Sequence, residues 1–496
     1  MSLLGLDIGT TACKAVVFDL HGQPLAAASR EYRLRTPAPG RIELDANEVW
    51  DAVKTVVREV NSGLRDPVEA IATSAQGEAV TPIGRDGSPL APSQITFDTR
   101  ATPQAAKLAD RIGRQRLFQI AGHPPHPMFS IAKIMWWAEH EPDIVAQTWK
   151  FLCYGDLVTW KLGGEPVIDF SMAARTMAFD IERQVWSDEV LAAASIPMSQ
   201  MPVAAPSSTP VDRVSPDMAR ELDFVGRPLL VAGGHDQPCG AYGANASAPG
   251  EAMFSIGTTA CLAPVFAQRA LGLMANDYCC YPHVAPGRWI TLAGNFTGGS
   301  LLRWYRDTFG AGMLAEARAT GRDFYDLLTE EAGDEPSPLL VLPHFGGSGA
   351  PHNDPVSKGA IVGMGFGTTR GQIVRALLEG VMFEIALNRE MLAAAGVDVA
   401  GIVAIGGGAR SDRWLRITAD ILGVPVRRAS QTEAACWGAA RLAGTGAGLL
   451  TDERLANDAG SSDRFQPDPK RSDYYRQRLP LYRELYGALR PLNAAL

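Results

Sequence analysis

The sequence predicts an α/β protein built from two similar domains. At 496 residues the chain is longer than one hydrophobic core usually supports. The hexapeptide Ile-Gly-Thr-Thr-Ala-Cys occurs at residues 8–13 and again at 256–261, each time between two apolar runs. The first part of the chain predicts three strands, a helix and a fourth strand, an order in which helices cover a sheet.

The first elements follow from apolar runs and turn residues. Two apolar runs meet at Gly-Thr-Thr, and His21-Gly22 leads into a third, so residues 3–30 predict a three-stranded meander. Asp45 and Glu48 have the spacing of a capping box, and valines recur behind them at helical spacing. The strand 68–75 follows. This order of elements is typical of a ribonuclease-H-like domain.

The middle of the chain predicts an inserted helical region, from about residue 100 to 200. A strand then ends in a Gly-rich loop, which marks the expected domain junction. The second half repeats the pattern of the first: a hairpin at 251–266, strands within 288–296, a loop at 343–355, a helix from Gln372 to about Ala395, a strand in 401–410 and a helix at 412–422. A third Gly-Thr-Thr, at 367–369, precedes a helix and predicts N-caps instead of phosphate ligands.

We therefore expect an N-terminal domain at residues 1–242, a second domain at 243–450, and a linker and helix at 451–496. The Tyr and Leu spacing of the last helix suits packing onto the body of the protein. A helix that binds a partner is the alternative.

Composition excludes several classes of partner. A net charge of −8 and an isoelectric point near 5.6 argue against binding to nucleic acid or to an anionic membrane. The start of the chain has no pattern of a signal peptide, and no apolar run is long enough to span a bilayer, so we expect a cytoplasmic protein. Seven cysteines without a Cys-x-x-Cys pair or zinc spacing indicate reduced thiols.

The repeated hexapeptide suggests a ligand. In each copy a glycine lets backbone N–H groups approach an anion closely, and the threonine hydroxyls can donate to it. A phosphate chain held between the two halves of the molecule suits two such hairpins. Two ordinary hairpin turns are the alternative.

Several stretches together resemble one family. They are GLDIGTTACKAVVFD, LLVAGGHDQPCGA, FSIGTTACL, PHNDPVSKGAIVGM and AIGGGARSDRWLRITADILGVPV, in this order. Their sequence and spacing are similar to those of the FGGY carbohydrate kinases, over residues 3–445. The resemblance is greatest to the xylulokinase branch, with further agreement in KIMWWAEHEPDI and IDFSMAARTMAFD. The resemblance implies two ribonuclease-H-like domains of the actin, hexokinase and Hsp70 superfamily, flanking a central cleft.

The resemblance also implies a chemistry. Phosphoryl transfer requires alignment, charge neutralisation and a base that accepts the proton of the attacking hydroxyl. Asp236, in the Gly-Gly-rich loop, matches the family's catalytic base; here His235 stands where the family commonly has a third glycine. Asp7 matches the carboxylate that holds Mg²⁺ of Mg·ATP, and Asp236 is the second expected metal-binding residue. A structural role for either aspartate is the alternative.

The expected nucleotide site draws on three segments. Gly9, Thr10 and Thr11 would face one side of the ATP phosphates, with Lys14 reaching toward them, and Gly257, Thr258 and Thr259 would face the other side. The turn at 406–410 resembles the family's adenosine-binding loop, with Gly407, Gly408, Ala409 and Arg410 at the pocket. Residues 433–444 predict a helix of small residues used for packing.

The resemblance places a sugar or polyol among Gln76, Gly77, Glu78, Asp98, Arg100 and Asp236. Xylulokinases usually have Met-His-Gly where this chain has Ala75-Gln76-Gly77, and a tryptophan where this chain has Phe97. D-Xylulose is the favoured substrate, and these departures leave open another ketopentose, a tetritol or another polyol.

We therefore expect an ATP-dependent sugar kinase with Mg²⁺ as cofactor, a small-molecule substrate and, by family resemblance, a homodimer. Two alternatives remain at this point. One is an actin- or Hsp70-like nucleotide switch that binds a protein partner, since one fold hosts unrelated functions. The other is a sugar-sensing relative that has lost activity, although every expected catalytic position is filled.

Overall fold

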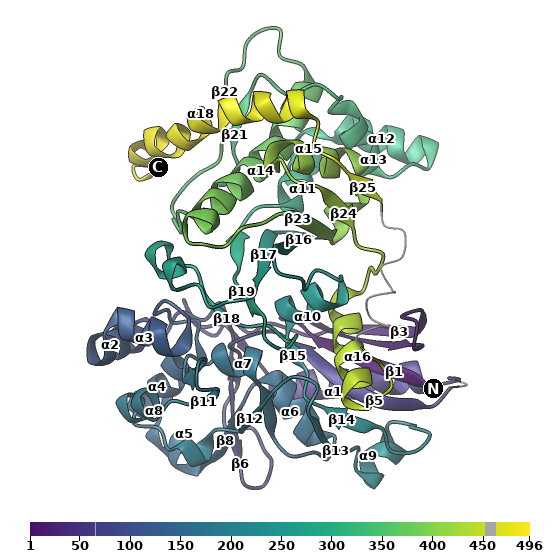
Figure 1. Ribbon diagram of the computed structural model, residues 1–496, viewed down its shortest axis with the longest axis vertical. Helices are drawn as coiled ribbons and strands as arrows, with labels where there is room; N and C mark the ends of the chain where they lie inside the picture. The colour runs from purple at the N-terminus through teal and green to yellow at the C-terminus, as the bar shows by residue number, and fades with distance from the viewer. Residues whose placement is uncertain (65, 452–462) are drawn as a thin grey trace. The chain divides into compact units, whose positions relative to one another are not determined.

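The computed structural model describes residues 1–64, 66–451 and 463–496 (Figure 1). These residues pack into two compact units. The first unit combines Met1–Ser247, Ala267–Ile290 and the described residues of Glu433–Gly460. The second combines Ala248–Phe266, Thr291–Thr432 and the described residues of Ser461–Leu496. The second unit is therefore built from three separate segments of the chain. The domain boundaries predicted from the sequence stay predictions.

The first unit is built on a seven-stranded sheet in the order β13-β14-β5-β1-β2-β3, with β15 also beside β5. The strands are β1 Ser2–Ile8, β2 Ala12–Phe18, β3 Pro24–Glu31, β5 Val68–Ala75, β13 Pro210–Arg213, β14 Leu229–Val231 and β15 Gly234–His235. The predicted meander and the strand at 68–75 are confirmed. β5 runs parallel to β1, β14 and β15, so the carboxyl ends of these strands lie at one edge.

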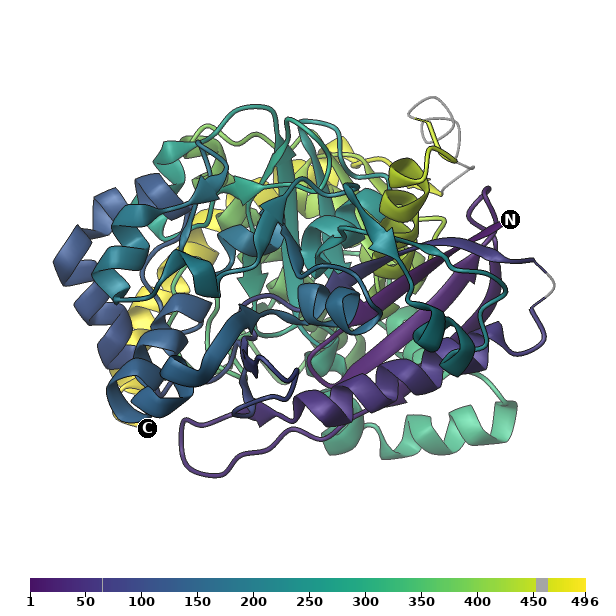
Figure 2. The same cartoon turned by 90° about the horizontal axis from the view of Figure 1, so that it is seen from below.

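Helix α1 (Ala46–Asn61) covers β2 and β3 of this sheet, as Figure 2 shows. All five of the predicted valines are buried in this contact: Val49, Val53, Val56, Val57 and Val60. The predicted capping box forms only in part. The Asp45 carboxylate accepts from the Asn47 N–H, but the Glu48 carboxylate accepts from the Arg33 N–H at 3.0 Å instead of closing back on the cap.

The predicted helical insertion is present in the first unit. Its helices, with the short helix that follows, are α2 Thr102–Ile112, α3 Arg114–Ala121, α4 Ser130–His140, α5 Pro142–Gln147, α6 Tyr154–Lys161, α7 Phe170–Ala174, α8 Asp188–Ala194 and α9 Pro216–Glu221. Three short strands precede these helices: β4 Glu43–Leu44, β6 Thr81–Gly84 and β7 Ser93–Gln94. Five more lie between the helices: β8 Thr148–Leu152, β9 Val167–Asp169, β10 Phe179–Asp180, β11 Val185–Trp186 and β12 Val203–Ala205. The unit also contains the hairpin strands β18 Tyr281–Pro282 and β19 Trp289–Ile290, and short 3-10 helices at Met198–Gln200 and Leu271–Asn276.

The second unit has a sheet in the order β17-β16-β23-β24-β25, with β20 beside β17. The strands are β16 Glu251–Ile256, β17 Ala260–Phe266, β20 Ala293–Asn295, β23 Gly401–Ile405, β24 Val426–Arg428 and β25 Arg464–Phe465. β16 pairs antiparallel with β17 and parallel with β23, as β1 does with β2 and β5. The predicted repetition of the pattern is confirmed at this level.

The two copies of the hexapeptide nevertheless close their hairpins differently. In the first copy Ile8 pairs with Cys13, whereas in the second Ile256 pairs with Ala260. The second loop is one residue shorter, and such a slip exchanges the faces of the sheet to which side chains point. Both predicted hairpins are therefore present, and their registers differ by one residue.

Helices of the second unit are α11 Gly299–Phe309, α12 Ala311–Thr320, α13 Phe324–Glu331, α14 Arg370–Ala394, α15 Asp412–Leu422 and α18 Pro469–Asn493, with a hairpin of β21 Leu340–Leu342 and β22 Ala360–Val362. Thr369 caps α14 in a capping box with Gln372, which confirms the N-cap predicted for the third Gly-Thr-Thr. The terminal helix α18 packs on α14 and α15 through the buried Tyr475 and Tyr482, as predicted (Figure 1). Most of the predicted linker, residues 452–462, lies outside the described residues.

Helix α16 (Ala434–Gly446) belongs to the first unit, where it packs on β1, β5 and helix α10 (Asp236–Gly243). Glycines permit this packing. A Cβ on Gly438 would lie 1.9 Å from the Cys239 carbonyl oxygen, and a Cβ on Gly5 would lie 1.8 Å from that of Cys436. The predicted packing helix is therefore confirmed, and its small residues let backbones touch.

Gly438→Ala tests this close approach. The new methyl group must push backbone apart, and we expect a loss of about 1–3 kcal/mol of unfolding free energy, measured by urea denaturation. Gly487→Ala is the matched control, because Gly487 lies within helix α18 with nothing near its missing Cβ. It should gain about 0.5–1 kcal/mol. Equal effects of the two substitutions would contradict the packing argument.

Candidate active site

Three predicted site residues meet at the carboxyl ends of parallel strands in the first unit. Asp7 lies near the end of β1, Gln76 directly follows β5, and Asp236 directly follows β15 as the first residue of α10. Asp7 is in register with Ser74, and His235 is in register with Ala75. This edge of a parallel sheet is the usual place for a ligand in an α/β protein.

Asp236 is a half-buried carboxylate in an environment that favours its protonated form. Burial, followed by the charges of Asp7 and Glu78, raises its pKa to about 7. Its Oδ1 lies 3.1 Å from His235 Nε2, without hydrogen-bond geometry, and has no hydrogen-bond partner among the described residues. Burial also holds the pKa of His235 well below its usual value, so that this ring is neutral. The carboxylate therefore keeps an oxygen available as a proton acceptor near neutral pH.

His235 stands where the family's loop commonly has a third glycine, and its contacts account for this departure. Its Nδ1 shares a hydrogen bond of 3.0 Å with the Tyr281 hydroxyl, which fixes the ring. A Cβ on Gly77 would lie 2.8 Å from His235 Nε2. Gly77 thus leaves the space that the histidine ring needs beside Asp236.

Asp7 receives one hydrogen bond from a neighbouring strand, from Ser74 Oγ at 2.7 Å. Burial raises its pKa, against the opposing effects of Ser74 and the positive charge of Lys14. A cation near Asp7 and Asp236 would relieve the repulsion between these carboxylates. Because no three acidic, His or Cys side chains suited to a metal converge among the described residues, a Mg²⁺ ion here would depend on these two carboxylates, phosphate and water. The donor types fit that ion.

Glu78 is buried and held in a strained backbone conformation, with φ of +62°. Its carboxylate forms an ion pair with Arg175 and accepts from Thr96 Oγ1 at 2.8 Å. Its carbonyl oxygen accepts from Lys133 Nζ at 2.9 Å and from Ser130 Oγ at 3.1 Å. Both carboxylate oxygens are thus engaged by the protein, and a solvated loop charge is excluded.

Asp98 and Arg100 form a second cluster. Arg100 donates from Nε to both oxygens of Asp98, at 2.9 and 3.0 Å, and from Nη2 to Glu43 at 2.5 Å. Asp98 also accepts from the Ile42 N–H at 2.8 Å and is fully buried. Phe97, by contrast, is 61% exposed. Of the predicted sugar residues, Gln76 keeps a buried and unpartnered oxygen within the described part of the chain, while its amide donates to the Gly9 carbonyl at 3.0 Å.

The first phosphate hairpin closes through a hydrogen bond of 2.9 Å from the Gly9 N–H to the Ala12 carbonyl. Thr11 is exposed, and Thr10 is half-buried. Lys14 Nζ forms an ion pair of 2.8 Å with Glu433, which competes with the predicted contact to phosphate.

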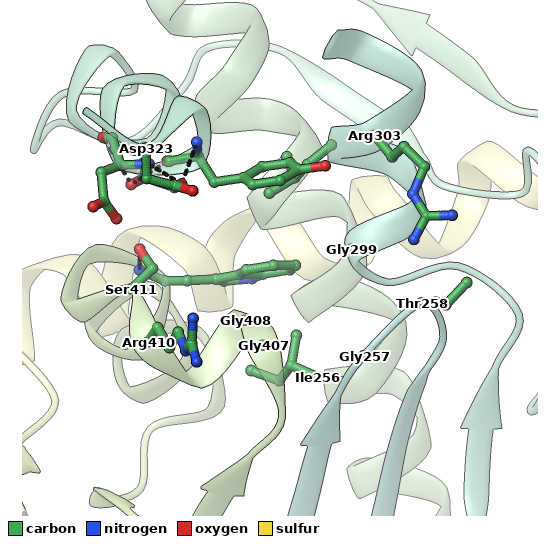
Figure 3. A pocket seen from close by; sticks show the side chains of 15 residues that line it. Ile256, Gly257, Thr258, Gly299, Arg303, Asp323, Gly407, Gly408, Arg410 and Ser411 are labelled. Carbon is green, nitrogen blue, oxygen red and sulfur yellow. Dashed lines mark hydrogen bonds between the residues drawn. The ribbon is translucent and has the colours of Figure 1, made fainter. Parts of the chain in front are cut away.

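The second unit contains a cavity of about 700 Å³, shown in Figure 3, at the end of β16. Five predicted nucleotide residues line it: Gly257, Thr258, Gly407, Gly408 and Arg410. Thr259 and Ala409 are not part of this lining. The other lining residues were not predicted: Ile256, Gly299, Leu302, Arg303, Asp323, Tyr325, Asp326, Thr329, Ser411 and Trp414. Two aromatic rings, two arginines and a glycine turn in a volume of this size suit a nucleotide.

Glycines at the turn after β23 bring this loop against β16. Gly406 has φ of +86°, and its missing Cβ would lie 2.8 Å from the Ile256 carbonyl. A Cβ on Gly408 would lie 2.3 Å from an Ile256 methyl group. The opposite wall includes the start of α11, where the Gly299 N–H donates to the Gly257 carbonyl at 2.7 Å.

Comparison with known families explains this arrangement. Residues 2–243 match the N-terminal domain of the FGGY family of carbohydrate kinases, and residues 252–447 match its C-terminal domain. The chain belongs to the FGGY family of carbohydrate kinases. It is therefore an ATP-dependent phosphotransferase whose acceptor is an alcohol group of a sugar or polyol. Membership favours catalysis over the nucleotide-switch alternative.

Relatives with different substrates are similarly distant. The chain is 27% identical to a xylulose kinase of Bacillus subtilis, over 100% of this chain and 98% of the relative. It is 32% identical to a glycerol kinase of Thermus brockianus, over 96% of each chain. A solved gluconate kinase from Lactobacillus acidophilus has a TM-score of 0.89 and 25% identity, with 98% of each chain covered.

Within the described residues, every helix is too short or too polar to cross a membrane.

The sequence missed several residues around Glu78 and Asp236. Arg175 lies in the stretch 168–180 that contributed to the family resemblance, but its role depends on Glu78, 97 residues away. Lys133 and Thr96 also contact Glu78 from distant segments of the chain. Only Trp414, beside the glycine turn in GGGARSDRW, carried a local signal.

Arg175→Met tests the buried ion pair. It would leave the Glu78 carboxylate without its cation, and we expect a loss of about 3–5 kcal/mol in urea unfolding. Arg116→Met is the matched control, because the Arg116–Glu189 pair is exposed and should contribute less than about 1 kcal/mol. Adding Glu78→Gln to Arg175→Met should recover part of the loss. Equal costs at the buried and exposed pairs would refute this account.

Proposed function

We propose that Asp236 is the general base of the kinase and that the acceptor is a ketopentose or related polyol, with D-xylulose as the first candidate. One observation carries the proposal. Asp236 stands at the edge where β1, β5 and β15 end, beside Asp7 and Gln76, with an unpartnered carboxylate oxygen and a pKa of about 7. These properties suit a base that accepts a proton from a sugar hydroxyl.

The described residues suggest a division of tasks. Asp236 would accept the hydroxyl proton as the oxygen attacks the γ-phosphorus of ATP, and Gln76 would orient the polyol with its free amide oxygen. Gly257 and Thr258 would hold the phosphates, while the cavity around Gly407 and Gly408 would hold the nucleoside. Asp7 would hold Mg²⁺ with Asp236, and that ion would supply charge neutralisation of the phosphates when bound.

The charges around the predicted sugar residues favour an uncharged acceptor. Arg100 is paired with Asp98 and Glu43, and Arg175 is paired with Glu78. Neither arginine is left to pair with a substrate carboxylate. This supports a ketose or polyol over an aldonate.

Asp236→Asn should lose about 10²–10⁴-fold in kcat, because the amide cannot accept the hydroxyl proton. ATP affinity, measured by calorimetry, should change little, since the residues of the nucleotide cavity are untouched. Asp217→Asn is the control: this carboxylate is 83% exposed on α9, and its loss should leave the turnover rate unchanged. Near-normal sugar phosphorylation by the Asp236 variant would overturn the assignment.

Substrate choice is tested by ADP release from Mg·ATP with pentuloses, hexuloses, tetritols, glycerol and gluconate. We expect the highest kcat/KM with D-xylulose, and Phe97→Trp should increase the preference for it. A clear preference for glycerol or gluconate would reject D-xylulose while leaving the role of Asp236 intact. In that case Gln76 and Phe97 are the first positions to exchange.

A further inference from the structure

The first unit contains a second, much smaller cavity directly before the Asp236 loop. It has a volume of about 10 Å³, the space of one water molecule or one alkali cation. Gly233 and Gly234, which lead into His235 and Asp236, form part of its wall. Thr73, Asp156, Thr159 and Asp169 supply oxygen-bearing side chains to the same wall.

Two buried carboxylates therefore face one small space. Asp169 is 5% exposed and already fully engaged: its Oδ1 accepts from the Met172 N–H, and its Oδ2 accepts from the Ser171 N–H and from the hydroxyls of Ser171 and Ser207. Asp156 is 2% exposed, and its Oδ2 accepts from the Cys153 N–H at 3.1 Å. Asp156 Oδ1 is buried and has no hydrogen-bond partner in the described chain.

Within the residues that the structure describes, these two carboxylates have no basic side chain as a partner. Among the described residues, no Lys, Arg or His nitrogen forms an ion pair with Asp156 or Asp169. Burial raises the pKa of Asp156 well above its usual value, so without a cation this group carries a proton. A cation in the cavity would displace that proton. A small cation would both contact the open oxygen and balance the charge.

The oxygen donors also indicate the charge of this cation. Carboxylate and hydroxyl oxygens are ligands for hard cations, and the soft thioether sulfur of Met172, which also lines the cavity, is a poor ligand for them. Because the oxygens of Asp169 are occupied by hydrogen bonds, Asp156 Oδ1 alone is left open. One open carboxylate oxygen suits a monovalent ion better than a divalent one.

The cavity is linked to the Asp236 loop by two hydrogen bonds. Ser171 Oγ donates to Asp169 Oδ2 at 2.6 Å and accepts from the His235 N–H at 3.0 Å. Asp169 thereby fixes the backbone of the residue directly before Asp236. A cation in the cavity would therefore act on the Asp236 loop through these hydrogen bonds.

We infer that the cavity between Asp156 and Asp169 binds a monovalent cation, Na⁺ or K⁺, which holds the loop that carries Asp236. Binding of the ion does not depend on the proposed sugar. Its effect on turnover rests on the proposed role of Asp236. The two parts are therefore measured separately.

Binding is tested by thermal unfolding of the whole protein in NaCl, KCl and tetramethylammonium chloride at equal ionic strength. Tetramethylammonium is too large for the cavity, so wild type should melt about 5 °C lower in that salt than in the better alkali salt. Asp156→Asn should lose this difference, whereas Asp143→Asn, at an exposed carboxylate on α5, should keep it. Equal melting of wild type in all three salts would overturn the inference.

A direct measurement keeps the test decisive if Asp156→Asn does not fold. Crystals of wild type soaked in thallium(I), a K⁺ analogue, should show an anomalous peak beside Asp156 Oδ1. Absence of that peak, with a water molecule in its place, rejects the cation. In the kinase assay, replacing the alkali cation should lower kcat while leaving KM for ATP unchanged. Salt-independent kcat with a thallium peak present would reject only the link to Asp236.

Discussion

The candidate active site depends on the parallel pairing of β5 with β1 on one side and with β14 and β15 on the other. This pairing sets Asp7, Gln76 and Asp236 at one edge, although they are far apart in the sequence. The pairing itself requires a glycine, because a Cβ on Gly233 would lie 1.8 Å from the Thr73 carbonyl. At this edge burial raises the pKa of Asp236, and the negative charges of Asp7 and Glu78 raise it further.

Identical sequence does not ensure identical geometry in the two phosphate hairpins. At the start of α11, the Gly298, Gly299 and Ser300 N–H groups donate hydrogen bonds to carbonyl oxygens of the second hairpin. In the described part of the chain, the first hairpin is instead held by Tyr32 and Gln76, which donate to the Gly9 carbonyl. The neighbours of each hairpin differ, and its register differs with them.

Local patterns predicted most of the fold, because strand and helix periodicity records which face is buried. The meander, α1, β5, α14, α15 and α18 were all predicted from such patterns. The glycine turn at 406–408 and Asp236 were predicted through the order of family motifs. The partners of Glu78 were not, since Arg175, Thr96 and Lys133 come from separate segments whose meeting depends on tertiary packing. For the same reason, the sequence did not predict the different registers of the two hairpins, or Arg303 and Tyr325 in the lining of the cavity in the second unit.

The place of α16 has a consequence for biosynthesis. Trp437 packs on Phe18 with ring centroids 5.0 Å apart, and Cys436, Ala440 and Leu442 join Leu3 and Val16 in the same core. β1 and β2 thus receive this cover only after a helix much further along the chain has been synthesised. Until then their apolar face is exposed to other nascent chains and to chaperones. Chains that stop before residue 433 lack this cover altogether, so the exposed sheet distinguishes them from chains that include α16.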